Sequence, residues 1–309
     1  MTGTAPVQGF VHPALFYEGQ DAYLAGTVPF LRQGLAAGEP AAVAAPPAQL
    51  GWLRRALGAD AERVVLIDMT DAGRNPGRII PQVLRGFADA HPASRVRIIG
   101  EPIWPGRTTL EYPACVQHEA LINAAFADRE VTILCPYDTA GLDADALDDA
   151  LTTHPVVIDD KGEWASDRYD PWGAVARYND LPPVPPHAAV HRFGAGALAE
   201  ARDFAAAEAR ALGMTVLRLI DLELAVAELT TNSVLHGGGS GTLRIWQEDG
   251  LVVCEVHDAG RLTDPLAGRR PATADEPNGR GLLLVNRVAQ LVRVRADAEG
   301  TTFRAYLAP

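Results

Sequence analysis

The segment Glu228-Leu229-Thr230-Thr231-Asn232-Ser233-Val234-Leu235-His236-Gly237 decides the fold of the C-terminal half. Its apolar residues predict a helix, on which Glu228 and Asn232 lie one turn apart on the same face. A carboxylate beside a neutral amide oxygen supplies a base and a ligand for a divalent cation. Two glycine-containing motifs follow, Asp258-Ala259-Gly260 and Gly279-Arg280-Gly281. This order of motifs indicates a nucleotide site that is built without a P-loop.

The residues around this segment show the pattern of an α+β layer. Apolar periodicity predicts two long helices, the second of which ends at the glycine run Gly237-Gly238-Gly239. It also predicts a shorter helix after the second glycine motif. Two alternating runs flank Glu248-Asp249-Gly250, which favours an antiparallel pair of strands. We therefore expect helices packed on one face of a mixed sheet. The expected strands are Val190–Phe193, Thr242–Gln247, Leu251–His257, Val292–Ala296 and Thr302–Leu307, and the expected helices are Ala197–Leu212, Thr215–Leu235 and Gly281–Leu291.

The N-terminal half has a different pattern, in which short apolar runs alternate with longer helical stretches. Such alternation predicts a parallel sheet that is covered by helices on both faces. Functional residues in such a sheet usually lie at the carboxyl ends of the strands. The expected strands are Ala14–Tyr17, Ala41–Ala45, Val64–Asp68, Val96–Gly100 and Val131–Cys135, and the expected helices are Gln20–Ala37, Ala48–Leu57, Pro76–Ala90 and Leu110–Ala127.

The chain of 309 residues is long enough for two domains. The proline-rich stretch Leu181-Pro182-Pro183-Val184-Pro185-Pro186 is typical of a stiff, extended linker, because proline fixes φ and lacks an amide donor. We therefore expect one domain over residues 1–180, a linker over 181–186 and a second domain over 187–309.

Composition excludes several classes of protein. The net charge of −12 makes general nucleic-acid binding unfavourable, so we expect no direct nucleic-acid partner. Lys161 is the only lysine, and no GxxxxGK[ST] string occurs, which excludes a Walker A loop. The three cysteines lack any CxxC spacing, which favours a reducing compartment. Since we find neither a signal peptide nor an apolar run of membrane-spanning length, we expect a cytoplasmic protein.

The three C-terminal motifs together resemble those of the GHKL ATPase superfamily, and in particular the small anti-sigma-factor serine kinases of bacteria. The resemblance covers about residues 187–309 and implies a Bergerat-type ATP-binding sandwich. Glu228 and Asn232 match the N box, and the Asp258 and Gly279 motifs match the two glycine boxes. Gly300-Thr301-Thr302-Phe303 stands where the family has its last threonine-bearing strand.

The resemblance implies a role for each matching residue. Asn232 would bind Mg²⁺ bridging the triphosphate of ATP, and Glu228 would be the general base. Asp258 would accept a hydrogen bond from the adenine amino group. Thr301 or Thr302 would touch adenine through a water molecule. The remaining expected ATP-binding residues are Gly260, Gly279, Arg280, Gly281 and Leu282, and residues 261–278 would form a lid.

The chain departs from the longer family members after Gly260, where Arg261–Pro265 lacks a further glycine. A sensor histidine kinase is a rival interpretation, but His187 and His191 precede a predicted strand and not a long dimerising helix. Three functions stay open for the chain: a switch kinase, a module that sequesters a sigma factor with ATP bound, and an atypical histidine kinase.

The N-terminal half, from about residue 9 to 180, resembles the MEDS sensory domain. The matching residues are His12–Glu18, Phe30–Leu35 and Gly38–Pro40, while Arg107–Tyr112 and Glu119 match more loosely. The resemblance implies a RecA-like α/β sheet without a working P-loop, and a small organic ligand. No paired His/Cys spacing occurs, so we expect neither haem nor a metal there. The residues expected to converge on one ligand pocket at the strand ends are His12, Tyr17, Glu18, Glu101, Trp104, Arg107 and Tyr112.

Together the two resemblances imply a signalling regulator. Its ATP- and Mg²⁺-dependent domain would phosphorylate a serine or threonine of an anti-sigma-factor antagonist, bind a sigma factor, or do both. The N-terminal domain would control this step through its small ligand. A homodimer is also implied, since the related kinases often pair through their sheets.

Overall fold

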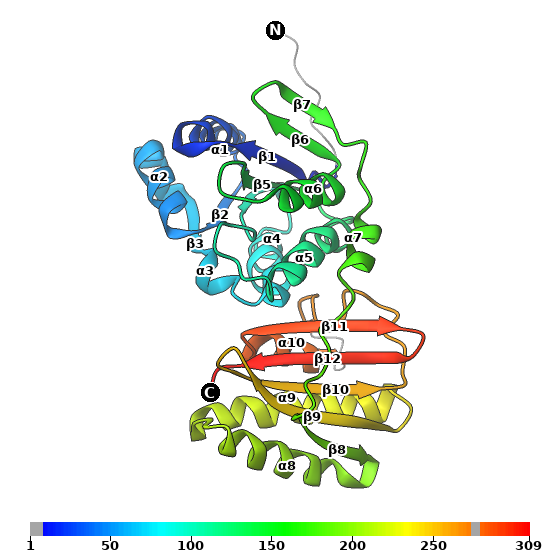
Figure 1. The fold of residues 1–309 in the computed structure, drawn as a ribbon. Coiled ribbons are helices and arrows are strands. Elements are labelled where there is room, and N and C mark those ends of the chain that lie inside the picture. Colours follow the sequence, from blue (N-terminus) through cyan, green and yellow to red (C-terminus); the bar gives the residue numbers. More distant parts are fainter. Residues whose placement is uncertain (1–8, 273–278) are drawn as a thin grey trace. The chain divides into compact units, whose positions relative to one another are not determined.

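The computed structural model describes residues 9–272 and 279–309. Backbone contacts divide the chain into two compact units (Figure 1). The N-terminal unit runs to Arg74 and continues from Ile79 to Tyr178, and the C-terminal unit contains Asn75–Arg78 and Asn179–Pro309. Each unit is built around its own sheet.

The sheet of the N-terminal unit has seven strands in the described residues, in the order β3-β2-β4-β5-β1-β6-β7. All neighbours pair in parallel except β6 and β7, which form an antiparallel hairpin. The predicted α/β fold with a mostly parallel sheet is therefore confirmed. The strands are β1 (Pro13–Tyr17), β2 (Ala41–Ala45), β3 (Val64–Asp68), β4 (Val96–Gly100), β5 (Val131–Asp138), β6 (Val156–Asp159) and β7 (Gly162–Ala165).

The hairpin of β6 and β7 was not among the expected elements. Strand β7 is exposed at all four residues, so its sequence lacks the apolar run that marks a buried strand. The predicted helix Pro76–Ala90 is also wrong as a single element. It is divided into a 3₁₀ turn (Pro76–Arg78), a π-helical turn (Ile79–Leu84) and helix α4 (Arg85–Asp89). Pro81 lies in the π-helical turn and has no amide hydrogen to donate, which disfavours a regular α-helix there.

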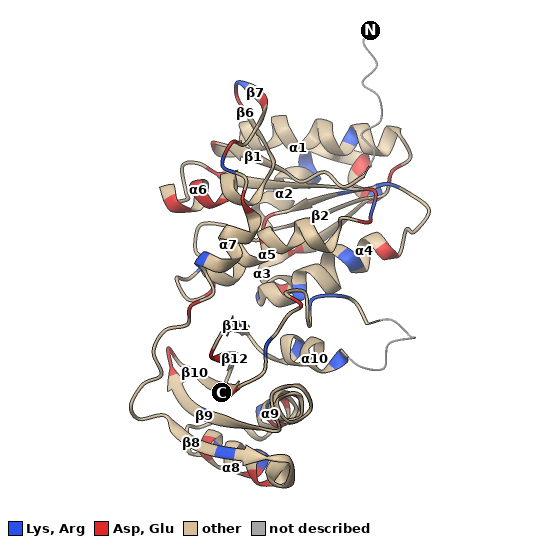
Figure 2. Ribbon diagram, turned by 90° about the vertical axis from the view of Figure 1, so that its right-hand side faces the viewer, with Lys and Arg blue, Asp and Glu red and all other residues tan. Residues whose placement is uncertain are grey.

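Helices lie on both faces of the N-terminal sheet (Figure 1). Buried residues of α1 and α2 pack with those of β1, β2 and β3 in one core cluster. Figure 2 shows acidic residues along α6, where Asp143 caps the helix by accepting a hydrogen bond from the amide of Ala146. The helices of this unit are α1 (Gly19–Ala36), α2 (Pro47–Leu57), α3 (Met69–Ala72), α5 (Tyr112–Ala125), α6 (Ala144–Thr153) and α7 (Pro171–Arg177).

The C-terminal unit has a five-stranded sheet in the order β11-β12-β10-β9-β8. Every pairing in it is antiparallel, so the expectation of a mixed sheet is wrong, although the α+β layer itself is confirmed. The helices cover one face, and Ala201, Ala205 and Ala209 let α8 approach the core closely. The elements are β8 (Ala189–Gly194), α8 (Leu198–Ala211), α9 (Val216–His236), β9 (Ser240–Glu248), β10 (Leu251–Asp258), α10 (Arg280–Val288), β11 (Leu291–Asp297) and β12 (Gly300–Leu307).

The proline-rich segment before β8 has neither helix nor strand over residues 179–185. It is held against the C-terminal sheet by hydrogen bonds to its backbone. Arg304 Nη2 donates to the carbonyl of Pro182 at 2.9 Å, and Arg293 Nη2 donates to that of Asp180 at 3.0 Å. None of the helices in the described part of the chain is long and apolar enough to cross a membrane.

Candidate functional site

Residues 228–236 form the C-terminal end of α9, Gly237 is its C-cap, and Asn232, His236 and Gly237 line a pocket of about 220 Å³. The pocket is closed by the end of β10, the start of α10 and the first residues of β12. All the predicted nucleotide-binding residues line it except Glu228, Arg280 and Thr302. The lining residues are Leu229, Asn232, His236, Gly237, Asp258, Gly260, Arg261, Leu262, Ala267, Gly279, Gly281, Leu282, Thr301 and Phe303.

Asp258 is held in one orientation at the end of β10. Ser233 Oγ donates a hydrogen bond to Oδ2 at 2.6 Å, and the amide of Gly260 donates to Oδ1 at 2.9 Å. A Cβ atom on Gly237 would lie 2.3 Å from the carboxyl carbon of Asp258, so only glycine leaves room for this carboxylate. The carboxylate is therefore a fixed hydrogen-bond acceptor on the pocket wall, suited to an amino group on a flat ligand.

Helix α10 begins beside Glu228. Gly279 has φ of +99°, a conformation that favours glycine, and turns the chain into the helix. A Cβ atom on Gly281 would lie 2.3 Å from Glu228 Oε2. Because residue 281 is glycine, the first turn of α10 approaches the carboxylate closely. The free amides of a helix N-terminus favour anions such as phosphate, and Gly279 and Gly281 line the pocket at this end of α10.

The two threonines of β12 lie on opposite faces of the sheet, as successive residues of a strand do. Thr301 lines the pocket, where its hydroxyl accepts a hydrogen bond from the amide of Leu262 at 3.1 Å and donates to the carbonyl of Gly260 at 2.8 Å. Thr302 Oγ1 lies 2.9 Å from His257 Nδ1, beside the proline-rich segment. The expectation that Thr302 is an alternative to Thr301 is therefore wrong.

The predicted lid over residues 261–278 is described only as far as residue 272, because residues 273–278 lie outside the described residues. The described part is anchored at both ends. Thr301 holds the amide of Leu262, and Asn286 Nδ2 of α10 donates to the carbonyl of Gly268 at 3.2 Å. These contacts connect the segment after Gly260 to the sheet and to α10, although Arg261–Pro265 lacks a further glycine.

The N-terminal residues that were expected to form one pocket lie at separate places. Glu18 is exposed at the start of α1. Tyr17 and Glu101 form a buried pair, and Trp104, Arg107 and Tyr112 line a different cavity. His12 lies at a third place, where it contacts Asn123 and Cys135. The single ligand pocket predicted from the sequence is wrong, because residues that follow different strands need not point to the same side of the sheet.

Glu101 is fully buried at the end of β4. Its Oε1 atom accepts hydrogen bonds from the hydroxyl of Tyr17 at 3.0 Å and from Gln49 Nε2 at 3.3 Å. Its Oε2 atom has no hydrogen-bond partner within the described residues. Burial raises the pKa of Glu101 to about 8, and the hydrogen bond from Tyr17 opposes this shift only in part. The carboxyl group is therefore protonated at neutral pH.

Replacement of Glu101 with glutamine is expected to flatten the pH dependence of stability. In wild type, the folded chain keeps a proton that the unfolded chain loses above pH 4.5, so stability falls as the pH rises from 4.5 to about 8. The slope approaches about 1.4 kcal/mol per pH unit. Urea unfolding at several values between about pH 5 and about pH 9 measures this slope. The control is Glu18→Gln, and an unchanged slope in Glu101→Gln would contradict the assignment.

A cavity of about 400 Å³ in the N-terminal unit lies beside α5 and α6. The guanidinium of Arg107 lies 3.8 Å from the centre of the Trp104 ring and donates to the carbonyls of Gly73 and Pro102. The hydroxyl of Tyr112 donates to Asp149 at 2.6 Å. The walls thus combine one aromatic–cation stack with polar groups, which suits a small organic ligand.

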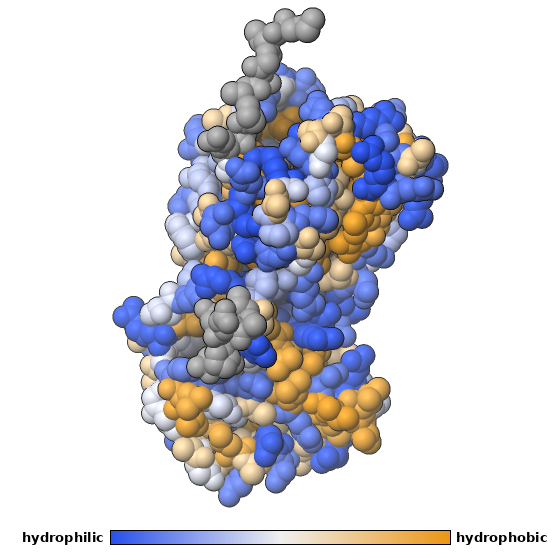
Figure 3. All heavy atoms as spheres, turned by 180° about the vertical axis from the view of Figure 1, so that it is seen from behind, coloured by the Kyte–Doolittle hydropathy of each residue, from blue (hydrophilic) through white to orange (hydrophobic). Residues whose placement is uncertain are grey.

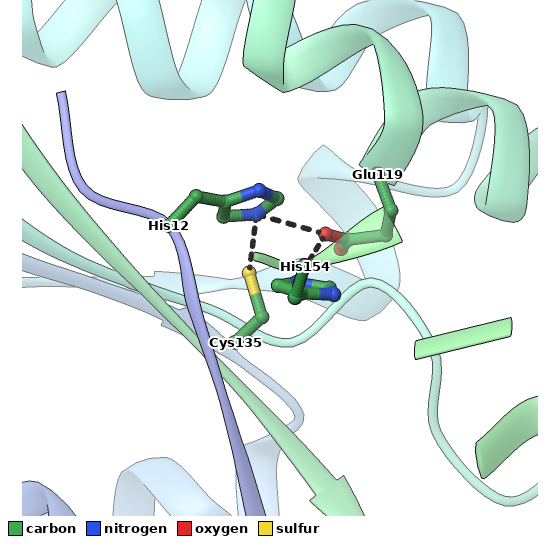
Figure 4. Close-up of side chains that lie close together, drawn as sticks. All are labelled: His12, Glu119, Cys135 and His154. Carbon is green, nitrogen blue, oxygen red and sulfur yellow. Dashed lines mark hydrogen bonds and ion pairs between the residues drawn. The ribbon is translucent and has the colours of Figure 1, made fainter. Parts of the chain in front are cut away.

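His12 belongs to a group that the sequence did not reveal. Together with Glu119, Cys135 and His154 it forms a cluster that is almost completely buried (Figure 4). Burial and the neighbouring His154 lower the pKa of His12 to about 4. The four residues lie far apart along the chain, so no spacing rule finds them. The parallel pairing of Ala14 in β1 with Cys135 in β5 was the available signal.

Two protein-family models match the chain. Residues 11–155 match the MEDS model, the methanogen/methylotroph DcmR sensory domain. Residues 194–307 match the model of the histidine kinase-like ATPase domain. No curated protein matches the chain.

Proposed function

We propose that this chain, which joins a MEDS sensory domain to a histidine kinase-like ATPase domain, phosphorylates a serine or threonine of a partner protein. The two matches identify a signalling protein with a sensory domain and an ATPase domain. We propose that it is a kinase of the anti-sigma-factor type, which acts on an anti-sigma-factor antagonist or binds a sigma factor. The small ligand of the MEDS domain would control it.

The observation that carries the proposal is the fixed carboxylate of Asp258 at one end of the pocket and the N-terminus of α10 at the other. The adenine amino group would donate to Asp258, which selects adenine over guanine. The phosphates would extend toward the amides of α10 and the side chain of Asn232. This arrangement supports ATP as the ligand.

Asn232 fits a role as magnesium ligand. Magnesium is bound in proteins through one or two protein oxygens together with phosphates and water, and Asn232 offers such an oxygen on the pocket wall. When bound, Mg²⁺ would neutralise the charge of the phosphate oxygens. No paired carboxylates are needed for this mode of binding.

Glu228 would be the base for the transfer step. The hydroxyl oxygen of the acceptor would form a bond to the γ-phosphorus as the bond between that phosphorus and the β,γ-bridging oxygen breaks. ADP leaves with the electron pair of that bond, and the hydroxyl proton passes to Glu228. Phosphoryl transfer depends mainly on positioning and charge stabilisation, which the α10 amides and Asn232 would supply.

A histidine acceptor in this chain is less favoured. Within residues 9–272, the only helix between β7 and β8 is α7, which has seven residues. A dimerising hairpin that presents a histidine needs two long helices. A partner protein is therefore the better source of the acceptor.

Sequestration of a partner is a second candidate function, favoured by exposed apolar residues at the start of α9. Val216, Leu217 and Ile220 expose 79%, 74% and 60% of their surface. Figure 3 shows apolar residues gathered on this side of the C-terminal unit. Such a surface suits contact with another protein.

The proposed function is tested by incubating the full chain with γ-labelled ATP, Mg²⁺ and candidate anti-sigma-factor antagonists. We expect label on the antagonist that is stable in acid, as a phosphoserine or phosphothreonine is. Acid-labile label on a histidine would replace the proposal with a histidine kinase. Binding of a sigma factor that needs ATP, without any labelled protein, would favour sequestration.

A further inference from the structure

We propose that His12, Glu119, Cys135 and His154 form a closed four-ligand site for a divalent transition metal ion of the zinc type. Each residue offers one ligand atom, and all four atoms lie within 4.8 Å of one another (Figure 4). Nitrogen, sulfur and carboxylate oxygen are the donors that Zn²⁺ takes in proteins. The site lies wholly within the N-terminal unit and is separate from the proposed nucleotide pocket.

The distances between the ligand atoms fit a tetrahedral ion. His12 Nε2 lies 3.2 Å from Glu119 Oε2 and 3.3 Å from Cys135 Sγ, and His154 Nε2 lies 3.2 Å from the same Glu119 oxygen. Metal–ligand bonds of about 2.0–2.3 Å at tetrahedral angles place neighbouring ligand atoms roughly 3.3–3.7 Å apart. These three distances are thus close to those of a loaded site, and the remaining ligand atoms lie within 4.8 Å of one another.

The hydrogen bonds around the two imidazoles leave Nε2 free to bind a metal. His154 Nδ1 lies 2.9 Å from the carbonyl of Ala150, which can only accept, so Nδ1 carries the hydrogen. Asn123 Nδ2 donates to the carbonyl of Thr153, and its Oδ1 therefore faces His12 Nδ1 at 3.2 Å as an acceptor. Histidines that bind a metal through Nε2 typically donate Nδ1–H to an acceptor of this kind.

The carboxylate of Glu119 lies within ion-pair distance of both imidazoles. Both of its oxygens, and Nε2 of His154, lack a hydrogen bond within the part of the chain that the structure describes. The side chains of Glu119 and His154 are fully buried. A buried carboxylate that takes no hydrogen bond is costly unless it is paired or binds a metal.

The charges also balance. With neutral imidazoles, the carboxylate of Glu119 and the thiolate of Cys135 together carry two negative charges, which a divalent ion neutralises. Binding releases one proton, that of the Cys135 thiol, to solvent. Because four protein groups complete the coordination and none is exposed, the site is of the closed, structural kind.

The site would join four elements of the N-terminal unit. His12 directly precedes β1, Cys135 lies on β5, Glu119 lies on α5, and His154 follows α6. Helices α5 and α6 also supply Tyr112 and Asp145 to the cavity of the sensory unit. Loss of the ion is therefore expected to loosen the helices that shape this cavity.

The test uses the full chain, purified without a polyhistidine tag, depleted with a chelator and titrated with Co²⁺ and Zn²⁺. We expect one equivalent of metal per chain, a thiolate-to-cobalt charge-transfer band with intense d–d bands, and a melting temperature raised by at least about 5 °C on Zn²⁺ addition. No binding by the folded chain would overturn the proposal, and His12 and His154 would then share protons with Glu119.

Variants of the cysteines and histidines identify the ligands. The double variant Cys115→Ala/Cys254→Ala leaves Cys135 as the only one of the three cysteines, and it must retain the charge-transfer band. Cys135→Ala must lose this band, and His154→Gln must weaken binding at least about 10-fold, whereas His118→Gln, at an equally buried histidine, must not. Should the site variants fail to fold, the double variant decides alone. Loss of the band in it would place the metal elsewhere and overturn the proposal.

Discussion

Asp258→Asn is expected to weaken ATP binding by roughly 10- to 100-fold. The carboxylate has two fixed donors, Ser233 and the amide of Gly260, and its position on the pocket wall leaves it able to accept from adenine. A hydrogen bond to a charged group contributes about 1.5–3 kcal/mol, which sets this range. The substitution also replaces one acceptor oxygen with a donor, so the preference for ATP over GTP should fall.

Isothermal titration of the full chain with ATP and with GTP, in the presence of Mg²⁺, measures both effects. Asp297→Asn is the matched control, because it removes the same charge at the end of β11 and lies away from the pocket. Thr301→Val should weaken binding less, and Thr302→Val should leave it nearly unchanged. Equal ATP affinity in wild type and Asp258→Asn would mean that adenine does not bind at this carboxylate.

The nucleotide pocket was predictable because its parts are local. Gly279 is needed where φ is positive, Gly281 where Glu228 approaches, and Gly237 beside Asp258. The backbone conformation or close approach that each motif needs is therefore visible in the glycines of that motif. The strands of both units were predictable for a related reason, since apolar runs such as β2 are buried at every residue.

The side-chain clusters of the N-terminal unit were less predictable, because they depend on how distant segments are arranged in the fold. Parallel pairing of β1 with β5 brings His12, which directly precedes β1, near Cys135, but Glu119 and His154 reach them from helix α5 and from the end of α6. The rotation of a helix with ten buried residues in fourteen, such as α5, cannot be derived from its periodicity. Nothing in the sequence therefore indicated that Glu119 faces His12, and the polar hairpin of β6 and β7 escaped notice because only β6 has an apolar run.

The antiparallel order of the C-terminal sheet illustrates the same limit. The hairpin of β9 and β10 follows from the turn at Asp249 and Gly250, both of which have positive φ. The pairing of β8 with β9 and of β12 with β10 joins segments distant in sequence. Such pairings leave no periodic signal, so the direction of those strands could not be predicted.

Glu228→Ala is expected to reduce the rate of phosphoryl transfer by at least about 100-fold, because a general base contributes roughly 10²–10⁴-fold to the rate. ATP affinity is expected to change by no more than about 3-fold. Glu228 does not line the pocket, but it contacts Gly281 where α10 begins, so it lies near the expected phosphates and away from adenine. Glu228→Gln should behave alike, since it keeps the shape and loses the basicity. The control is Glu223→Ala, which removes a carboxylate elsewhere on α9.

Parallel measurements of ATP affinity by calorimetry and of label transfer to the antagonist separate binding from chemistry. A kinase requires Glu228 only for phosphoryl transfer. A sequestering module binds its partner equally well with glutamate or alanine at position 228. If Glu228→Ala and Glu228→Gln both transfer label at the wild-type rate, the acceptor hydroxyl loses its proton to another group, and positioning by Asn232 and α10 supplies the catalysis. Loss of ATP binding in both variants would assign Glu228 to the nucleotide site through its contact with the first turn of α10.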